Sequence, residues 1–173
     1  MSGLTFSQLQ QYKEEGFVMV PDVFDSADIQ PLRDELTEVI HAKALELCAE
    51  GKLCSLYENE PFERRLTRIF RDAPEIIGAI MGKGGGGHSG RAFFDFVRHP
   101  SLMKKIESLV GEEIVGSSVY RIRPKVPSWD RGAVPWHQDS GYFSQHCDKE
   151  LIVTCWIPLV DATTENGCLR VLP

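Results

Sequence analysis

Apolar residues recur three to four positions apart between about residues 27 and 50, and this spacing predicts one long amphipathic helix. The apolar positions of this stretch are Leu32, Leu36, Val39, Ile40 and Leu47. Gly51 follows the last of them and stands where such a helix is expected to end. The pattern therefore predicts a helix that buries one face and leaves charged residues on the other.

Shorter helical patterns flank this long helix. Residues 5–16 predict a helix that ends at Gly16, and residues 100–110 predict another. Residues 52–80 are expected to be helical in part, with breaks at Pro61 and Pro74. Residues 17–20, Phe-Val-Met-Val, predict a short strand between the first two helices.

The pattern changes after Gly111, where β-branched residues and short-range alternation predict strands. The strand-like stretches are 113–126, 134–143, 151–163 and 168–173. Helices followed by strands, without a repeating strand-helix-strand order, predict the α+β class. We expect residues 1–173 to form a single incomplete domain, mainly helical over about 1–112, with the first strands of a core over about 113–173.

Composition excludes several classes of protein. The chain has 173 residues, 42% of them hydrophobic, and its 25 acidic and 19 basic residues give a net charge of −6. This balance argues against broad nucleic-acid binding, which needs a basic surface. No apolar run approaches membrane-spanning length and no secretory signal is evident, so we expect no membrane partner. The odd number of five cysteines, without paired Cys-x-x-Cys spacing, is typical of reduced thiols and indicates a cytoplasmic location.

Two segments are candidates for loops that cover a site. Residues 82–90 contain four successive glycines but lack the lysine-serine ending of a phosphate-binding loop, so we interpret them as a loop in which His88 is solvated. Residues 128–134 are the second candidate. The cations Arg121, Arg123 and Lys125 precede this segment. Two interpretations of them remain open, contact with an anionic group or a solvated strand edge, and the second is favoured.

The chemically informative motif is His137-Gln138-Asp139. In a strand, residues two apart point to the same face, so His137 and Asp139 would present an imidazole and a carboxylate side by side. These groups are two of the three ligands of the 2-His-1-carboxylate triad of non-haem iron enzymes. The short motif occurs by chance in many proteins, and alone it does not decide between a metal site and an ordinary polar pair.

The residues around the motif carry a family resemblance. Trp136 precedes it, Ser-Gly-Tyr-Phe follows it, and residues 151–161 (LIVTCWIPLVD) and 165–173 (ENGCLRVLP) come next. This succession resembles the phytanoyl-CoA dioxygenase family of Fe(II)/2-oxoglutarate-dependent oxygenases. The likeness is specific from Trp136 onward, looser over residues 5–40, and weak between about 50 and 110.

The resemblance implies a double-stranded β-helix core of the jelly-roll or cupin-like kind, here truncated, with Fe(II), 2-oxoglutarate and O2 as cofactor and co-substrates. It implies that His137 and Asp139 bind the iron. Gln138 and Trp156 match positions that lie against 2-oxoglutarate in relatives, although Trp156 could equally be a core aromatic. An aspartate rather than a small residue at 139 favours hydroxylation of a small organic or acyl substrate.

The resemblance also implies parts that the sequence does not contain. In relatives, a second histidine ligand and an arginine that pairs with 2-oxoglutarate lie beyond the segment matching 165–173. Three hypotheses therefore remain open: an oxygenase in its complete form, a catalytically inactive truncated or degenerate member that acts as a binding or regulatory protein, or a metal-binding cupin-like protein that does not use 2-oxoglutarate. Strands without their neighbours would expose sheet edges, through which self-association or a partner chain is expected.

Overall fold

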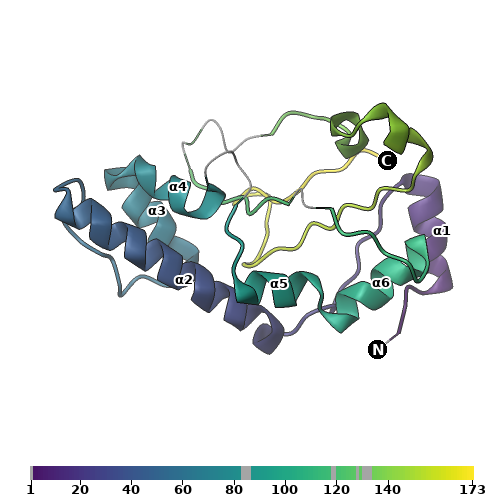
Figure 1. Cartoon of the computed structure of the whole chain (residues 1–173), viewed down its shortest axis with the longest axis horizontal. Helices are drawn as coiled ribbons and strands as arrows, with labels where there is room; N and C mark the ends of the chain where they lie inside the picture. Colours follow the sequence, from purple (N-terminus) through teal and green to yellow (C-terminus); the bar gives the residue numbers. More distant parts are fainter. Residues whose placement is uncertain (1, 83–86, 118–119, 128, 130–133) are drawn as a thin grey trace. The chain divides into compact units, whose positions relative to one another are not determined.

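The computed structural model describes residues 2–82, 87–117, 120–127, 129 and 134–173. The chain divides into two compact units. One unit contains residues 1–25, 98–116 and 134–173, and the other contains residues 26–97 and 117–133. The described residues form the helices α1 to α6 and the short 3-10 helices η1, η3 and η4 (Figure 1).

Helix α2 (Ser26–Ala49) organises the second unit and confirms the long helix predicted from apolar spacing. Its buried residues are Leu32, Leu36, Ile40, Ala44 and Leu47. They repeat three to four positions apart, so they line one face of the helix. Gly51 follows the helix with a φ of 71°, a left-handed conformation that glycine adopts without strain. The apolar repeat and the glycine after its last residue thus define the extent of α2.

The buried face of α2 contacts three other helices of the unit, which are α3 (Phe62–Asp72), α4 (Ile77–Met81) and α5 (Arg91–Val97). The predicted breaks at Pro61 and Pro74 are confirmed, since Pro61 is the N-cap of α3 and Pro74 begins η1 (Pro74–Ile76). Helix α5 was not predicted from the sequence.

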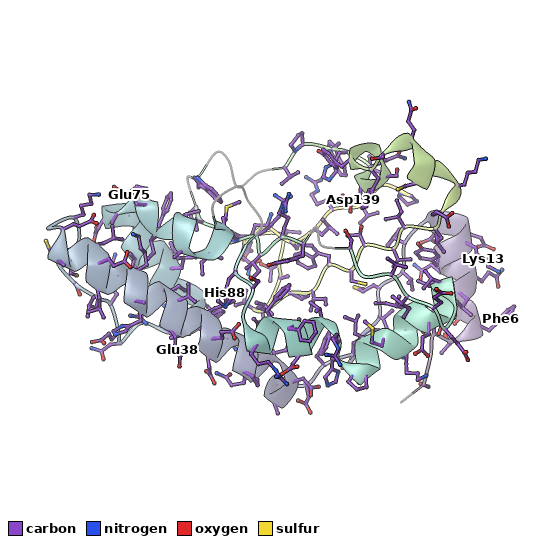
Figure 2. The ribbon with its side chains drawn as sticks, in the orientation of Figure 1. Phe6, Lys13, Glu38, Glu75, His88 and Asp139 are labelled. Carbon is purple, nitrogen blue, oxygen red and sulfur yellow. The ribbon has the colours of Figure 1, made fainter. Side chains whose placement is uncertain are left out.

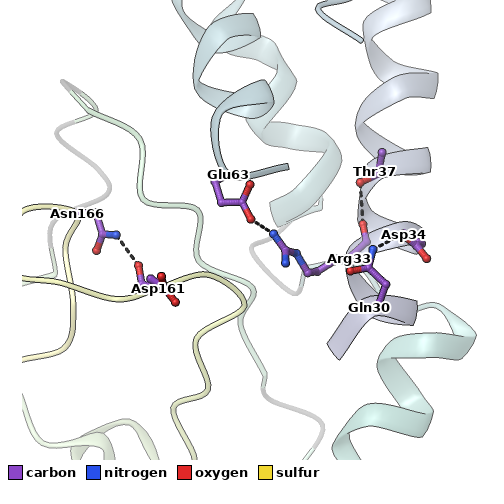
Figure 3. A network of polar contacts seen from close by, with 7 residues as sticks. All are labelled: Gln30, Arg33, Asp34, Thr37, Glu63, Asp161 and Asn166. Carbon is purple, nitrogen blue, oxygen red and sulfur yellow. Dashed lines mark hydrogen bonds and ion pairs between the residues drawn. The ribbon is translucent and has the colours of Figure 1, made fainter. Parts of the chain in front are cut away.

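Polar contacts add to this packing. Arg33 of α2 pairs with Glu63 of α3 (Figure 3). The guanidinium of Arg33 also lies 4.7 Å from the centre of the Phe62 ring.

The first unit contains α1 (Phe6–Glu15) and α6 (Pro100–Val110), both confirming predicted helices. Thr5 caps α1 in a capping box with Gln8, and Gly16 ends the helix in a left-handed conformation. The segment before α1 is joined to α6, because Leu4 N–H donates to Ser108 Oγ and Lys105 Nζ donates to the Gly3 carbonyl. These contacts join two segments that lie about one hundred positions apart in sequence.

The predicted strands are wrong. The described residues form no strand, neither at 17–20 nor after Gly111, so neither the α+β class nor a double-stranded β-helix core is present in them (Figure 1). Residues 139–149 instead contain η3 (Asp139–Tyr142) and η4 (Gln145–Lys149). A strand is stabilised by hydrogen bonds to a neighbouring strand, which β-branched composition alone does not provide. The described part of this chain is therefore helical, with long irregular connections.

The segment from residue 134 onward exposes many apolar side chains. They include Trp136, Tyr142, Leu151, Trp156, Leu169 and Leu172. The described residues form no sheet, so they have no exposed sheet edges through which the expected self-association could occur. Self-association or binding of a partner chain stays a prediction. Among the residues described, no helix is both long enough and apolar enough to cross a membrane.

Candidate metal site

The side chains of His137 and Asp139 converge, with His137 Nε2 3.1 Å from Asp139 Oδ1. The segment is not a strand, but the intervening residue Gln138 has extended dihedrals, φ −108° and ψ 131°. An extended residue places its two neighbours on the same side of the chain. One extended residue, Gln138, is therefore enough to bring the two side chains together, and a whole strand is not needed. Asp139 is labelled in Figure 2.

The other ring nitrogen of His137 fixes the orientation of the imidazole. Nδ1 lies 2.7 Å from the carbonyl oxygen of Pro135. A carbonyl oxygen only accepts hydrogen bonds, so Nδ1 carries the proton of this contact. In the neutral ring, Nε2 then presents a lone pair toward the carboxylate of Asp139. Two facing lone pairs are stabilised only by a shared proton or by a cation held between them.

The donor set fits a divalent transition metal. Imidazole and carboxylate ligands bind such ions at about 2.1 Å, and two adjacent ligands at a right angle are then about 3.0 Å apart. The observed 3.1 Å between Nε2 and Oδ1 agrees with that separation. The histidine is also held through its second nitrogen, as metal-binding histidines usually are. Over the described residues, no group of three or more His, Cys, Asp or Glu side chains that could hold a metal ion gathers.

Aromatic residues that carried the family resemblance lie next to this pair, and the sequence did not predict their contacts. The Tyr142 ring meets His137 edge to face, with 5.3 Å between ring centres. The Arg170 guanidinium lies 6.0 Å from the centre of the Trp136 ring, and Trp136 is 60% exposed. The pair therefore has an aromatic neighbour on each side in sequence, at positions 136 and 142.

The two predicted 2-oxoglutarate residues are both accessible. Gln138 lies between His137 and Asp139, is exposed, and forms the N-cap of η3. Trp156 belongs to the same unit and is 40% exposed, so it is not a fully buried core aromatic. The predicted covering loops lie in part outside the described residues, at 83–86, 128 and 130–133.

A second polar cluster lies in the other unit, around Glu35. His88 Nε2 lies 2.9 Å from Glu35 Oε1, and Ala92 N–H donates to Glu35 Oε2 at 2.9 Å. Phe93 N–H completes the set at 3.4 Å. The expectation that His88 (labelled in Figure 2) is a solvated loop residue is therefore wrong, since its side chain is only 22% exposed and contacts Glu35.

The contacts of Glu35 change its acidity. Desolvation is the largest single influence and raises the pKa of Glu35, but the hydrogen bonds from Ala92, His88 and Phe93 together outweigh it. The pKa of Glu35 is consequently lowered from its ordinary value. Glu35 thus acts as an ionised cap for the first turn of α5.

Comparison with known protein families assigns the chain to a class of oxygenases. The family model for phytanoyl-CoA dioxygenase (PhyH) matches residues 12–173, and the chain belongs to this family. The resemblance drawn from the residues around His137 and Asp139 is thereby confirmed at the level of the family.

Individual relatives give the same result. The chain is 26% identical over 176 residues to the peroxisomal phytanoyl-CoA dioxygenase of Homo sapiens, covering 98% of this chain and 47% of that relative. It is 24% identical over 176 residues to the protein of the same name from Bos taurus, with the same coverage. The chain thus spans about half the length of the curated relatives it matches. No solved structure matches significantly. The names place these relatives in the peroxisome, and a cytoplasmic location for this chain stays a prediction.

Proposed function

We propose that this chain supplies part of the Fe(II) site of a 2-oxoglutarate-dependent dioxygenase that hydroxylates an acyl-CoA thioester. The single observation that carries the proposal is the convergence of His137 Nε2 and Asp139 Oδ1 at 3.1 Å. Membership of the phytanoyl-CoA dioxygenase family supports the reaction type and the acyl-CoA substrate. In this proposal residues 1–173 belong to one oxygenase domain and form only part of it.

The roles of the two ligands follow from their contacts. His137 offers the Nε2 lone pair, and the Pro135 carbonyl holds the ring by accepting from Nδ1–H. Asp139 supplies negative charge beside that lone pair, so a divalent cation is favoured over a neutral guest. The edge-to-face contact with Tyr142 limits rotation of the imidazole. Bound Fe(II), together with 2-oxoglutarate and O2, supplies the oxidation that converts a C–H bond to a C–OH group.

We assign Gln138 and Trp156 to the 2-oxoglutarate side of the site. The Gln138 amide can donate hydrogen bonds to a carboxylate, and the accessible Trp156 indole can cover the carbon chain of the co-substrate. Neither residue is a metal ligand in this proposal. Loss of either should therefore weaken the use of 2-oxoglutarate without preventing metal binding.

The test is succinate formation from 2-oxoglutarate, with Fe(II), ascorbate and an acyl-CoA, by a protein of family length that contains this chain. His137→Ala and Asp139→Ala should abolish succinate formation, whereas Gln138→Ala should raise the KM for 2-oxoglutarate with a smaller effect on kcat. Circular dichroism serves as the folding control. If the unaltered protein binds the acyl-CoA but forms no succinate, the oxygenase proposal fails in favour of a non-catalytic binding protein.

A further inference from the structure

The segment 120–126 has two faces that differ in chemistry. Burial alternates along it with a period of two, since Arg121, Arg123 and Lys125 are exposed while the two residues between them are partly buried. This alternation is typical of an extended chain lying on a surface. All three exposed positions carry a positive charge. We call these three residues the basic stripe.

The inner face fixes the segment to its own unit. The Tyr120 ring lies 4.4 Å, centre to centre, from the ring of Phe93 in α5, and Val126 is only 8% exposed. Three residues further on, Trp129 meets Phe70 of α3 at 6.3 Å. Contacts at both ends of the segment hold its backbone in place, so the three cations of the outer face project from a backbone of fixed position.

The basic stripe differs from other cations of the same unit. Lys43, Lys52 and Arg91 each pair with an acidic side chain on the helices or their ends. Within the described residues, no ion pair involves a residue of the basic stripe, and the contact of Arg121 is with the Tyr120 carbonyl. In that part of the chain the three neighbouring cations therefore have no acidic partner, although the net charge of the chain is −6. Their mutual repulsion is relieved when an anion binds among them.

The spacing selects the kind of anion. Residues two apart in an extended chain are about 7 Å apart at their backbones, and long Arg and Lys side chains can converge from that distance on neighbouring phosphate groups. Two guanidinium groups favour phosphate oxygens because they bind them in a forked geometry. A single carboxylate would occupy only one of the three cations.

We propose that the basic stripe binds the phosphate groups of the coenzyme A carrier of the substrate. The inference rests on the acyl-CoA substrate proposed above and locates its carrier, but it does not depend on the iron ligands. It also explains why an acidic protein keeps three cations together on one exposed edge. Nucleic acid is the less favoured ligand, because the overall charge of the chain opposes extended contact with a polyanion.

The experiment is calorimetric titration of the iron-free chain with coenzyme A, inorganic pyrophosphate and the phosphate-free fragment pantetheine. In the stripe variant, Arg121→Gln/Arg123→Gln/Lys125→Gln, the affinity for coenzyme A and pyrophosphate should fall tenfold or more. Pantetheine binding should be unchanged by the variant. Added salt should weaken coenzyme A binding to the unaltered chain, because exposed charges are screened.

The matched control is Lys43→Gln/Lys52→Gln/Arg91→Gln, which changes the net charge equally at paired cations of the same unit. Its affinity for coenzyme A should stay within twofold of the unaltered chain. If the triple variant unfolds, the single variants Arg123→Gln and Arg123→Lys replace it. Arg123→Gln should lower the affinity for coenzyme A several-fold, and Arg123→Lys should lower it less.

Equal losses in the stripe variant and the control, or no binding of coenzyme A by the unaltered chain, would overturn the proposal. Tighter stripe-dependent binding of a single-stranded oligonucleotide would also overturn it. Because no iron is present, these results leave the roles of His137 and Asp139 unaffected, and the succinate assay in turn leaves the basic stripe unaffected.

Discussion

The carboxylate of Glu35 occupies the space into which a side chain at Gly90 would project. A Cβ built on Gly90 would come closer than 3.0 Å to both carboxylate oxygens of Glu35, a separation that real Cβ atoms essentially never show. Gly90 precedes α5 and offers no capping side chain, and Glu35 of α2 caps the helix instead. The absence of a side chain at one residue thus allows the cap supplied by the other.

Gly90→Ala should destabilise the protein by about 1–3 kcal/mol, because the added methyl group displaces the Glu35 carboxylate from its hydrogen bonds. The matched control is Gly78→Ala in α4, where an added Cβ meets nothing within 4 Å. That substitution should be neutral or stabilise by up to about 1 kcal/mol, since alanine favours helix. Urea denaturation measures both free energies of unfolding.

Glu35→Ala should lower the free energy of unfolding by about 1–3 kcal/mol, because it leaves the N–H groups of Ala92 and Phe93 without their acceptor. Glu38→Ala makes the same chemical change at an exposed position of the same helix and should cost less than about 0.5 kcal/mol. Equal effects of the two substitutions would contradict the capping role.

The double variant Glu35→Ala/Gly90→Ala tests whether these residues act together. Both substitutions remove the same contacts, so the double variant should cost little more than either change alone. Its free energy of unfolding is compared with those of the two single variants under the same urea conditions. Fully additive losses in the free energy of unfolding would mean that the methyl group at residue 90 destabilises the protein through contacts other than those of Glu35.

The contribution of Glu35 should depend on pH in a defined direction. Hydrogen bonds from Ala92, His88 and Phe93 lower its pKa in the folded protein from its ordinary value, so the folded state releases this proton more readily than the unfolded state. The contribution is therefore fully present above that value and is lost as the pH falls through the folded pKa. The stability difference between the unaltered protein and Glu35→Ala, measured from about pH 6 to about pH 3, should shrink on acidification. A difference that grows would contradict the sign.

The helices were predictable because their signals are local. The apolar repeat from Leu32 to Leu47 and the glycines at 16, 51 and 111 specify three helices without reference to distant residues. The prediction of strands was wrong for the opposite reason, since a strand needs a neighbouring strand that its own local sequence does not identify. The convergence of His137 and Asp139 was predictable because it needs only one extended residue, Gln138, between them.

The cluster at Glu35 was not predictable from sequence position. Glu35 and His88 are 53 residues apart. Gly90, which precedes the short helix α5, has no side chain that could cap it, so the sequence lacks the usual signal of a helix start. A signal was nonetheless present, because a helix that begins after Gly90 needs an acceptor from elsewhere for its first N–H groups. The sequence does not identify the residue that provides it.

Metal binding by the chain itself tests the central claim most directly. With two ligands, His137 and Asp139, the chain should bind Fe(II) weakly, as measured anaerobically by isothermal titration, and turn over 2-oxoglutarate negligibly. His137→Ala and Asp139→Ala should each abolish the binding, whereas Glu165→Gln, an exposed acid of the same unit, should leave it unchanged. Fe(II) binding that survives both Ala substitutions would show that these side chains are not ligands and would contradict the account.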